Sequence, residues 1–369
     1  MYANNDRLMN NSPRRTGTAH LPLHGGKAPA WLFTRMTRLA REITVAIVSD
    51  FGPNEMLYRL SDPYWFQAFG CVLGFDWHSS GVTTTVCGAV KEGIKGMESE
   101  LGFFVAGGKG GTSRKTPSEI EGAGHLINAN AEKLIYASRM AAKVDNNAVQ
   151  DGYQLYHHVF CFTKAGDWAV IQQGMNEENR YARRYHWLGE KVTDFVCEPH
   201  SAVCSEANAA TLNLVASESS NARDTIAGIT RQENPDKIMA QLRNLQSLEL
   251  PRRHEMLVTD IHPDRLYKIF IKTYENQPED FEKLLGMEGV GAKTLRALSL
   301  ISEIIYGVPA SFRDPARFSF AHGGKDGIPY PVDRKTYDKS IEILHNALEK
   351  AKIEDTVKIA AIKRLELWK

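Results

Sequence analysis

A short glycine-containing segment late in the chain constrains the fold most strongly. Two stretches of apolar residues at helical spacing flank residues 289–294, which read Gly-Val-Gly-Ala-Lys-Thr. Gly289 and Gly291 permit a tight turn and a close approach of the backbone to a ligand, because glycine has no Cβ. The first turn of the second helix has free backbone N–H groups and the positive end of the helix dipole, which together favour an anion. Lys293 and Thr294 would add a charge and a hydroxyl group. The sequence therefore predicts two helices joined by a phosphate-binding turn.

The segment from about 278 to 307 resembles the helix–hairpin–helix of DNA repair glycosylases, polymerases and ligases. The hairpin of those proteins reads Leu-Pro-Gly-Val-Gly-x-x-Thr or similar. The resemblance implies sequence-independent contact with the backbone of duplex DNA, which positions a substrate without specifying its bases. The motif by itself names no reaction.

The overall charge limits how such a chain can bind a polyanion. Lys and Arg number 45 and Asp and Glu number 44 in 369 residues, so the formal net charge is +1. Contact with nucleic acid must therefore come from a local basic patch and not from the field of the whole protein. Five cysteines, a polar N-terminus and the lack of a long apolar run favour a cytoplasmic, nucleoid-associated protein.

Hydrophobic periodicity predicts an α+β fold that is mainly helical and contains a small antiparallel sheet. Residues 154–163 and 168–174 are predicted to form two strands joined by a short glycine-containing loop. Asn176 is expected to cap a helix that runs to about Leu188. The expected divisions of the chain are a frayed tail at 1–13, an α+β catalytic body at 14–250 with an irregular segment at 198–250, and a helical DNA-binding module at 251–369.

A second glycine-rich segment, residues 107–116, carries Lys109, Arg114 and Lys115. Oriented backbone N–H groups together with cations can cradle phosphate, although a flexible solvated loop has the same composition. The segment lacks the Walker pattern, because its Gly-Lys pair is followed by glycine and not by serine or threonine. We therefore expect no ATP hydrolysis here. The shorter segment 24–27, His-Gly-Gly-Lys, also combines glycines with a lysine and is a weaker candidate for phosphate contact.

Lys143 is the strongest candidate for a nucleophilic amine. It shares a predicted helix face with Arg139 at i, i+4 spacing, and small apolar residues surround it. Partial burial makes the neutral amine of a lysine more accessible, as nucleophilic catalysis requires. A solvated lysine on an exposed helix face is the alternative. Lys109 is the second candidate for the same role.

Amide, imidazole, aromatic and arginine side chains alternate through residues 150–187. Arg183 and Arg184, which stand between tyrosines in this segment, suit phosphate contact and base stacking. A hydrogen-bonded polar core would use the same residue types.

Cys197, His200 and Cys204 are metal-ligand types, but the group lacks a fourth ligand.

Several separate blocks resemble domain-of-unknown-function family seven-six-three, found mostly in archaea and some bacteria. The resemblance spans roughly residues 14–197 and 281–335 and implies a DNA lyase that acts on abasic sites, with an unusual fold. It does not identify the family's nucleophile in this chain. The matching blocks are 15–19, 21–27, 76–81, 106–110, 140–146, 150–158 and 173–176.

The implied reaction sets chemical requirements. Lys143 would attack the C1′ aldehyde of an abasic site and form an imine, and Asp145 or His157 would then remove the C2′ proton. The reaction needs no metal or cofactor, and the expected partner is damaged duplex DNA. Phosphates would be held by Lys27, Lys109, Arg114, Lys115, Arg139, Arg183 and Arg184.

Two other functions are compatible with the sequence. A metal-dependent nuclease could hold a divalent ion with Asp76, His78, Asp145, Asp151 and His157. A DNA-binding protein without catalytic activity would show salt-sensitive binding and no strand cleavage.

Overall fold

The computed structural model describes residues 28–75, 80–178, 180–205, 210–246, 263–316 and 334–366. The fold is α+β and mainly helical, which confirms the predicted class. Within these ranges no helix combines the length and the apolar character that crossing a bilayer requires.

Five antiparallel strands form the main sheet, in the order β1-β3-β4-β5-β6. A two-stranded ladder of β2 and β7 lies beside it. The strands are β1 (Phe103–Lys109), β2 (Val149–Gln150), β3 (Gln154–Thr163), β4 (Trp168–Asn176), β5 (Tyr181–Leu188), β6 (Ala202–Cys204) and β7 (Leu212–Asn213).

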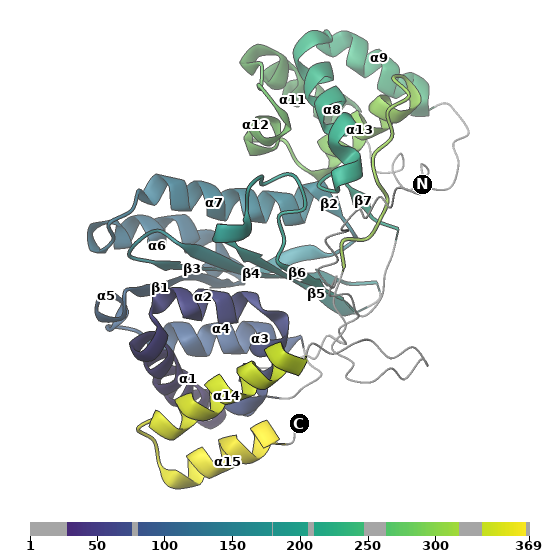
Figure 1. The fold of residues 1–369 in the computed structure, drawn as a ribbon. Helices are drawn as coiled ribbons and strands as arrows, with labels where there is room; N and C mark the ends of the chain where they lie inside the picture. The colour runs from purple at the N-terminus through teal and green to yellow at the C-terminus, as the bar shows by residue number, and fades with distance from the viewer. Residues whose placement is uncertain are drawn as a thin grey trace, which may run out of the picture.

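Helices cover both faces of the main sheet (Figure 1). On one face, Phe160 and Phe162 of β3 pack beneath α7 (Ala131–Lys143) and α6 (Thr116–Ala123). On the other face, Val159 and Cys161 join a second core with helices α1 to α4. Because both faces are buried, the strands lack the apolar–polar alternation of a half-exposed sheet. The remaining N-terminal helices are α1 (Ala30–Phe51), α2 (Pro53–Ser61), α3 (Pro63–Leu73), α4 (Gly81–Gly93) and α5 (Glu98–Leu101).

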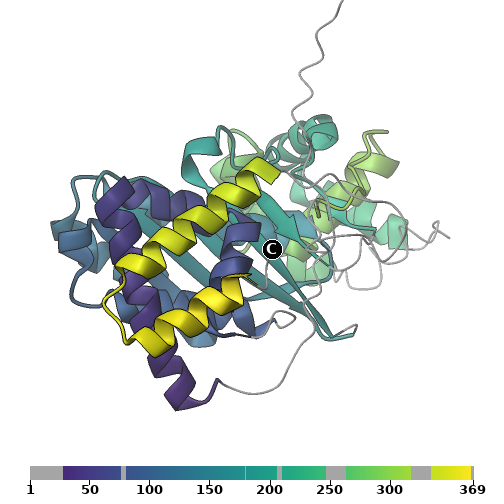
Figure 2. The ribbon, with the colours of Figure 1, turned by 60° about the horizontal axis from the view of Figure 1, so that its bottom comes forward.

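The second half of the chain is divided differently from the expected boundary near residue 250. Helices α8 and α9, which precede that point, pack against α11 and α13, which follow it. The last two helices pack instead against α1 and α3 at the opposite side of the sheet (Figure 2). The helices thus group according to the partners that their apolar faces contact, and residues 251–369 do not form one module. The helices are α8 (Ser220–Gln232), α9 (Pro235–Gln246), α11 (Pro263–Asn276), α12 (Phe281–Gly286), α13 (Ala292–Ile304), α14 (Arg334–Lys350) and α15 (Asp355–Glu366).

Local sequence signals explain several helix boundaries. The Asp62 side chain accepts hydrogen bonds from the backbone N–H groups of Tyr64 and Trp65, and a proline follows at the first helical position of α3. Asn130 caps α7 in the same way. The short helical turns are η1 (Gly110–Lys115), η2 (Gly124–Leu126), η3 (Val144–Ala148, a π turn), η4 (Gly189–Lys191) and η5 (Ser217–Ser219).

The helix predicted from Asn176 to about Leu188 is wrong, because β5 occupies most of that segment. Residues 182–188 of β5 are all buried, so both faces of the strand carry large side chains. The resulting run of arginine and aromatic residues has no period of two that would identify a strand from sequence.

Replacing Gly93 with alanine tests the packing of α4 on α1. A Cβ at Gly93 would lie 2.8 Å from the carbonyl oxygen of Thr37 and 3.1 Å from the backbone nitrogen of Arg41, so the helices must separate. We expect Gly93→Ala to lower the free energy of unfolding by about 1–3 kcal/mol. Gly228→Ala in α8 is the control. Nothing lies within 4 Å of its added Cβ, and we expect a gain of about 0.5–1 kcal/mol. Equal stability of both variants by denaturant unfolding would contradict this packing.

Candidate functional site

A cavity of about 400 Å³ opens between the C-terminal half of α7, the η1 turn and the start of β3. Three cationic side chains line it, those of Arg114, Arg139 and Lys143. Among the described lining residues there is no aspartate or glutamate, and the uncharged polar ones include Asn146, Asn147, Ser138 and Tyr156. The cavity therefore suits an anionic ligand of the size of a small organic molecule.

Gly107 fixes the way the chain leaves β1 and enters the cavity wall. Its φ is +90°, and a Cβ there would lie 2.3 Å from the carbonyl oxygen of His158 and 2.5 Å from Oγ1 of Thr116. Only glycine fits such a position. The chain then places the exposed Lys109 at the end of β1, with Nζ 5.8 Å from the centroid of the Tyr156 ring. Lys115, at the end of η1, is also exposed.

Lys143 joins the cavity to the segment between α12 and α13. Its Nζ donates hydrogen bonds to the carbonyl oxygens of Leu285 (2.7 Å), Met287 (2.5 Å) and Val290 (3.4 Å). Burial lowers the pKa of Lys143, Glu288 opposes the shift and Lys272 adds to it. The amine is therefore partly desolvated. Its three carbonyl acceptors, however, favour the charged form.

Residues 287–291 form the turn between α12 and α13. Gly289 is exposed with φ +89°, and no side chain caps the N-terminus of α13 at Gly291. A Cβ on Gly291 would lie 3.8 Å from Oδ1 of Asn147, so the turn lies against the cavity wall. Lys293 is exposed as expected. Thr294 is 2 % exposed, so the expectation that its hydroxyl faces a ligand is wrong. It belongs to the apolar face that α13 buries.

Two neighbouring histidines of β3 differ in their surroundings. His158 uses both ring nitrogens, with Ser138 Oγ at 2.8 Å and Gln172 Oε1 at 2.7 Å. His157 is equally buried, yet neither ring nitrogen has a hydrogen-bond partner in the part of the chain that the structure describes. Burial, with smaller contributions from His158 and Lys109, lowers the pKa of His157 to about 3. His157 is therefore neutral at pH 7.

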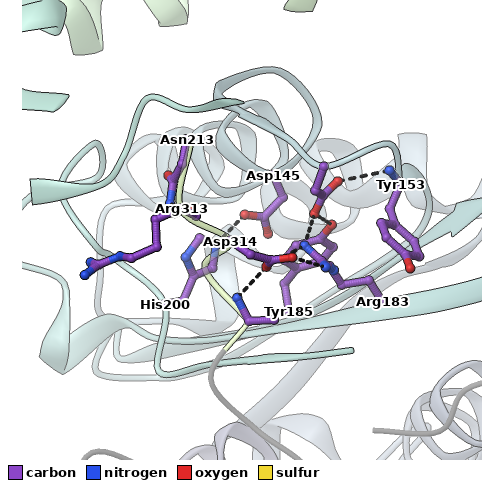
Figure 3. Close-up of polar contacts among 10 residues, drawn as sticks. Asp145, Tyr153, Arg183, Tyr185, His200, Asn213, Arg313 and Asp314 are labelled. Carbon is purple, nitrogen blue, oxygen red and sulfur yellow. Dashed lines mark hydrogen bonds and ion pairs between the residues drawn. The ribbon is translucent and has the colours of Figure 1, made fainter. Parts of the chain in front are cut away.

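Asp145 lies outside the cavity, on the sheet side of η3. Its carboxylate is fully buried and accepts hydrogen bonds from Gln172 Nε2 (2.5 Å) and Trp187 Nε1 (2.9 Å). It also accepts a hydrogen bond from His200 Nε2 (2.5 Å) (Figure 3). The structure does not bring Asp145 to the Lys143 amine, although only one residue separates them. Sequence reasoning missed His200 as its partner, because His200 lies 55 residues away in a loop without local pattern.

Arg183 and Arg184 are completely buried, so the expectation that they contact phosphate is wrong. Arg183 pairs with Asp151 at 2.9 Å and with Asp314 at 2.8 Å, and Tyr185 also donates to Asp151 (Figure 3). The guanidinium of Arg184 lies 4.7 Å from the centroid of the Phe66 ring. Helices on both faces of the sheet enclose these side chains, and the polar-core alternative applies to them.

The remaining expected site residues are placed as follows. Lys27, Asp76 and His78 lie outside the described residues. Within the described ranges, no group of three or more His, Cys, Asp or Glu side chains is arranged to hold a metal ion. The cavity thus gathers Arg114, Arg139, Lys143 and His157, with Lys109 and Lys115 on adjoining elements. Asp145, Arg183 and Arg184 are buried away from it.

The buried His157 predicts a specific dependence of stability on pH. Its folded-state pKa of about 3 lies below the unfolded value of about 6.5, so between these values only the unfolded state binds the proton. Stability therefore falls as pH decreases through this window, by about 2 kcal/mol at pH 5 for this group alone. When the free energy of unfolding is measured in urea, its dependence on pH should be less steep for His157→Leu than for the wild type, by the contribution of about one bound proton. The exposed His125 provides the control variant, His125→Gln, which should keep it. Parallel pH profiles for the wild type and His157→Leu would refute the assignment.

A family model described as protein of unknown function, DUF763, matches residues 17–332. No curated protein and no solved structure matches the chain. The match includes the cavity, the 287–291 turn and the buried residues Asp145, Arg183 and Arg184, and α14 and α15 lie beyond it. Because it covers most of the chain, this protein belongs to the DUF763 family.

Proposed function

We propose that the protein binds duplex DNA along the cavity and the 287–291 turn and cleaves the strand at abasic sites as a lyase. One observation carries the proposal. The cavity is lined by three cations and by no described carboxylate, and it adjoins a glycine turn at a helix N-terminus that no side chain caps. Lys143 lines the cavity and donates a hydrogen bond to the turn. The family resemblance points to the same activity.

The charge distribution supports backbone contact. The chain as a whole is close to neutral, with a net charge of +1, so a local group of cations must supply the attraction for a polyanion. Arg114, Arg139 and Lys115 are exposed around the cavity, and Lys293 is exposed at the start of α13. The turn and the cavity are joined by the hydrogen bonds of Lys143 to Met287 and Val290, and Asn147 lies near Gly291. One DNA strand could therefore contact both regions.

Lys143 is the better of the two candidate nucleophiles. Its amine lines the cavity, and burial lowers its pKa, which favours the neutral, reactive form. Attack requires that the amine leave the carbonyl groups of Leu285 and Met287, so DNA contact at the turn would be coupled to nucleophile release. Lys109 is the alternative, because its amine has no hydrogen-bond or ion-pair partner among the described residues.

The proposed reaction proceeds by β-elimination. The neutral amine adds to the C1′ aldehyde of the open-chain sugar, and loss of water gives an imine. Protonation of the imine acidifies the C2′ proton. A base removes that proton, the C2′–H electrons form the C2′=C3′ bond, and the C3′–O bond breaks with loss of the 3′ phosphate. An abasic nucleotide costs less to extrude from the duplex than a paired one.

Borohydride trapping on a duplex with one abasic site, in EDTA, tests the proposal. The wild type should form a covalent protein–DNA band. Lys143→Arg should form none, because a guanidinium cannot form the imine, whereas its donors can still reach the carbonyl groups of the turn. Lys109→Arg should be trapped like the wild type. Trapping of Lys143→Arg together with loss in Lys109→Arg would transfer the role to Lys109, and no band with any protein would reject the lyase proposal.

The salt dependence of DNA binding tests the cavity as a phosphate site. The double variant Arg114→Ala/Arg139→Ala should bind intact duplex more weakly, and the slope of log K against log salt should fall by about 0.9 for each phosphate that the variant no longer neutralises. Lys133→Ala removes an exposed cation at the other end of α7, outside the cavity lining, and should leave the slope unchanged. Equal slopes for the double variant and the wild type would place the DNA elsewhere.

A further inference from the structure

We infer that the preferred substrate of the cavity is an abasic residue at the 5′ end of a nicked strand, which carries a terminal phosphate, and not one inside a continuous strand. The inference rests on the proposed lyase function and names the substrate class within it. It follows from the charge that lines the cavity, from the spacing of two of its cations and from the way in which a strand must enter.

The cavity contains more positive charge than an internal abasic residue neutralises. Arg114, Arg139 and Lys143 line it, and the described lining residues include no aspartate or glutamate. The phosphates on the two sides of an internal residue carry about one negative charge each. A terminal phosphate carries about two at neutral pH, so a 5′-terminal residue together with its 3′ phosphodiester brings about three. The terminal residue therefore matches the three cations more closely.

The two guanidinium groups are available to an anion. Arg114 and Arg139 are exposed, and neither has an ion-pair or hydrogen-bond partner among the described residues. Glu119, which follows Arg114 in the chain, bonds instead to Nζ of Lys91 and to the N–H of Gly107, each at 2.7 Å. A guanidinium can donate two parallel hydrogen bonds to one phosphate, so these arginines suit a terminal group with three free oxygens.

The spacing of Arg139 and Lys143 fits a single sugar phosphate. They lie one helical turn apart on α7, so their Cβ atoms are about 5–6 Å apart, and both residues line the cavity. The C1′ aldehyde and the phosphate on C5′ belong to one sugar and are separated by a similar distance. An amine that attacks C1′ therefore leaves the guanidinium of Arg139 beside the phosphate of the same sugar. Arg114 adds a second guanidinium from the η1 wall.

A strand end enters such a cavity more readily than the interior of a strand. The volume of about 400 Å³ accommodates a sugar with one phosphate. An internal residue has strand on both sides, so it must be extruded from the duplex and the backbone must bend sharply. A 5′-terminal residue has strand on one side only. The exposed Lys109 and Lys115, on elements that adjoin the cavity, are placed to contact that strand.

The reaction on this substrate removes the sugar from the strand. The neutral amine of Lys143 adds to C1′, and loss of water gives the imine, which is then protonated. The C2′ proton passes to solvent, its electron pair forms the C2′=C3′ bond, and the C3′–O bond breaks. The leaving group is the 5′ phosphate of the next nucleotide. Hydrolysis of the imine then frees the lysine and releases the unsaturated sugar with its own phosphate.

This substrate class places the protein after an incision step. A hydrolase that cuts the phosphodiester on the 5′ side of an abasic site, leaving a 3′ hydroxyl, must supply the terminal residue. The elimination leaves a gap of one nucleotide between a 3′ hydroxyl and a 5′ phosphate. Those ends suit a following reaction of nucleotide addition and strand joining.

The experiment compares two duplexes of one sequence, in EDTA. One contains an internal abasic site, and the other is nicked on the 5′ side of that site so that the sugar carries a terminal phosphate. We expect kcat/KM for elimination to be about tenfold higher on the nicked duplex, because of the extra charge-assisted hydrogen bonds. Arg114→Gln and Arg139→Gln should each reduce this ratio. Lys133→Gln, which removes an exposed cation outside the cavity lining, should keep it.

A binding measurement isolates the contribution of the phosphate from the chemistry. A nicked duplex with a 5′-terminal tetrahydrofuran, which has no aldehyde, should bind about tenfold more tightly with a 5′ phosphate than with a 5′ hydroxyl. The two arginine variants should lose this difference. Equal affinities for the wild type, or equal kcat/KM on the nicked and internal substrates, would overturn the inference. Failure of the wild type to trap or cleave either abasic duplex would instead reject the lyase function.

Discussion

The hydrogen bonds from the Lys143 amine to the carbonyl groups of Leu285, Met287 and Val290 connect the cavity to the turn between α12 and α13. They attach the end of α7, which lies on the sheet, to the turn between α12 and α13. Gln150 strengthens the same junction by donating to the carbonyl of Ala292 and accepting from Arg296. The cavity and the turn are therefore parts of one continuous surface, and a ligand at the turn can influence the lysine directly.

Buried polar side chains, among them Asp145, Asp151 and Arg183, lie on the other side of this junction. Asp145 of η3 accepts hydrogen bonds from Gln172 of β4 and Trp187 of β5. His200, in the loop after β5, also donates to it (Figure 3). Arg183 in turn links Asp151 to Asp314. Buried charges are costly unless they are paired, so the carboxylates of Asp145 and Asp151 constrain the segments that surround them. The end of α7 thus has a cationic, accessible side and an anionic, enclosed side.

The sequence predicted features that depend on local signals and failed where distant partners decide. The glycine turn follows from neighbouring residues, and small apolar residues around Lys143 correctly suggested its partial burial. Its acceptors lie 142 to 147 residues later, and Asp314 lies 131 residues from Arg183. Such pairings cannot be inferred from spacing in one sequence. Arg183, Arg184 and Thr294 were therefore expected at a surface and are buried.

The proposed lyase function requires that an amine in the cavity form a covalent intermediate with an abasic sugar. Its most direct test is mass spectrometric mapping of the borohydride-reduced complex after proteolysis and nuclease digestion. We predict a sugar adduct on the peptide that contains Lys143. An adduct only on a lysine away from the cavity, or no adduct under conditions of full strand cleavage, would contradict it.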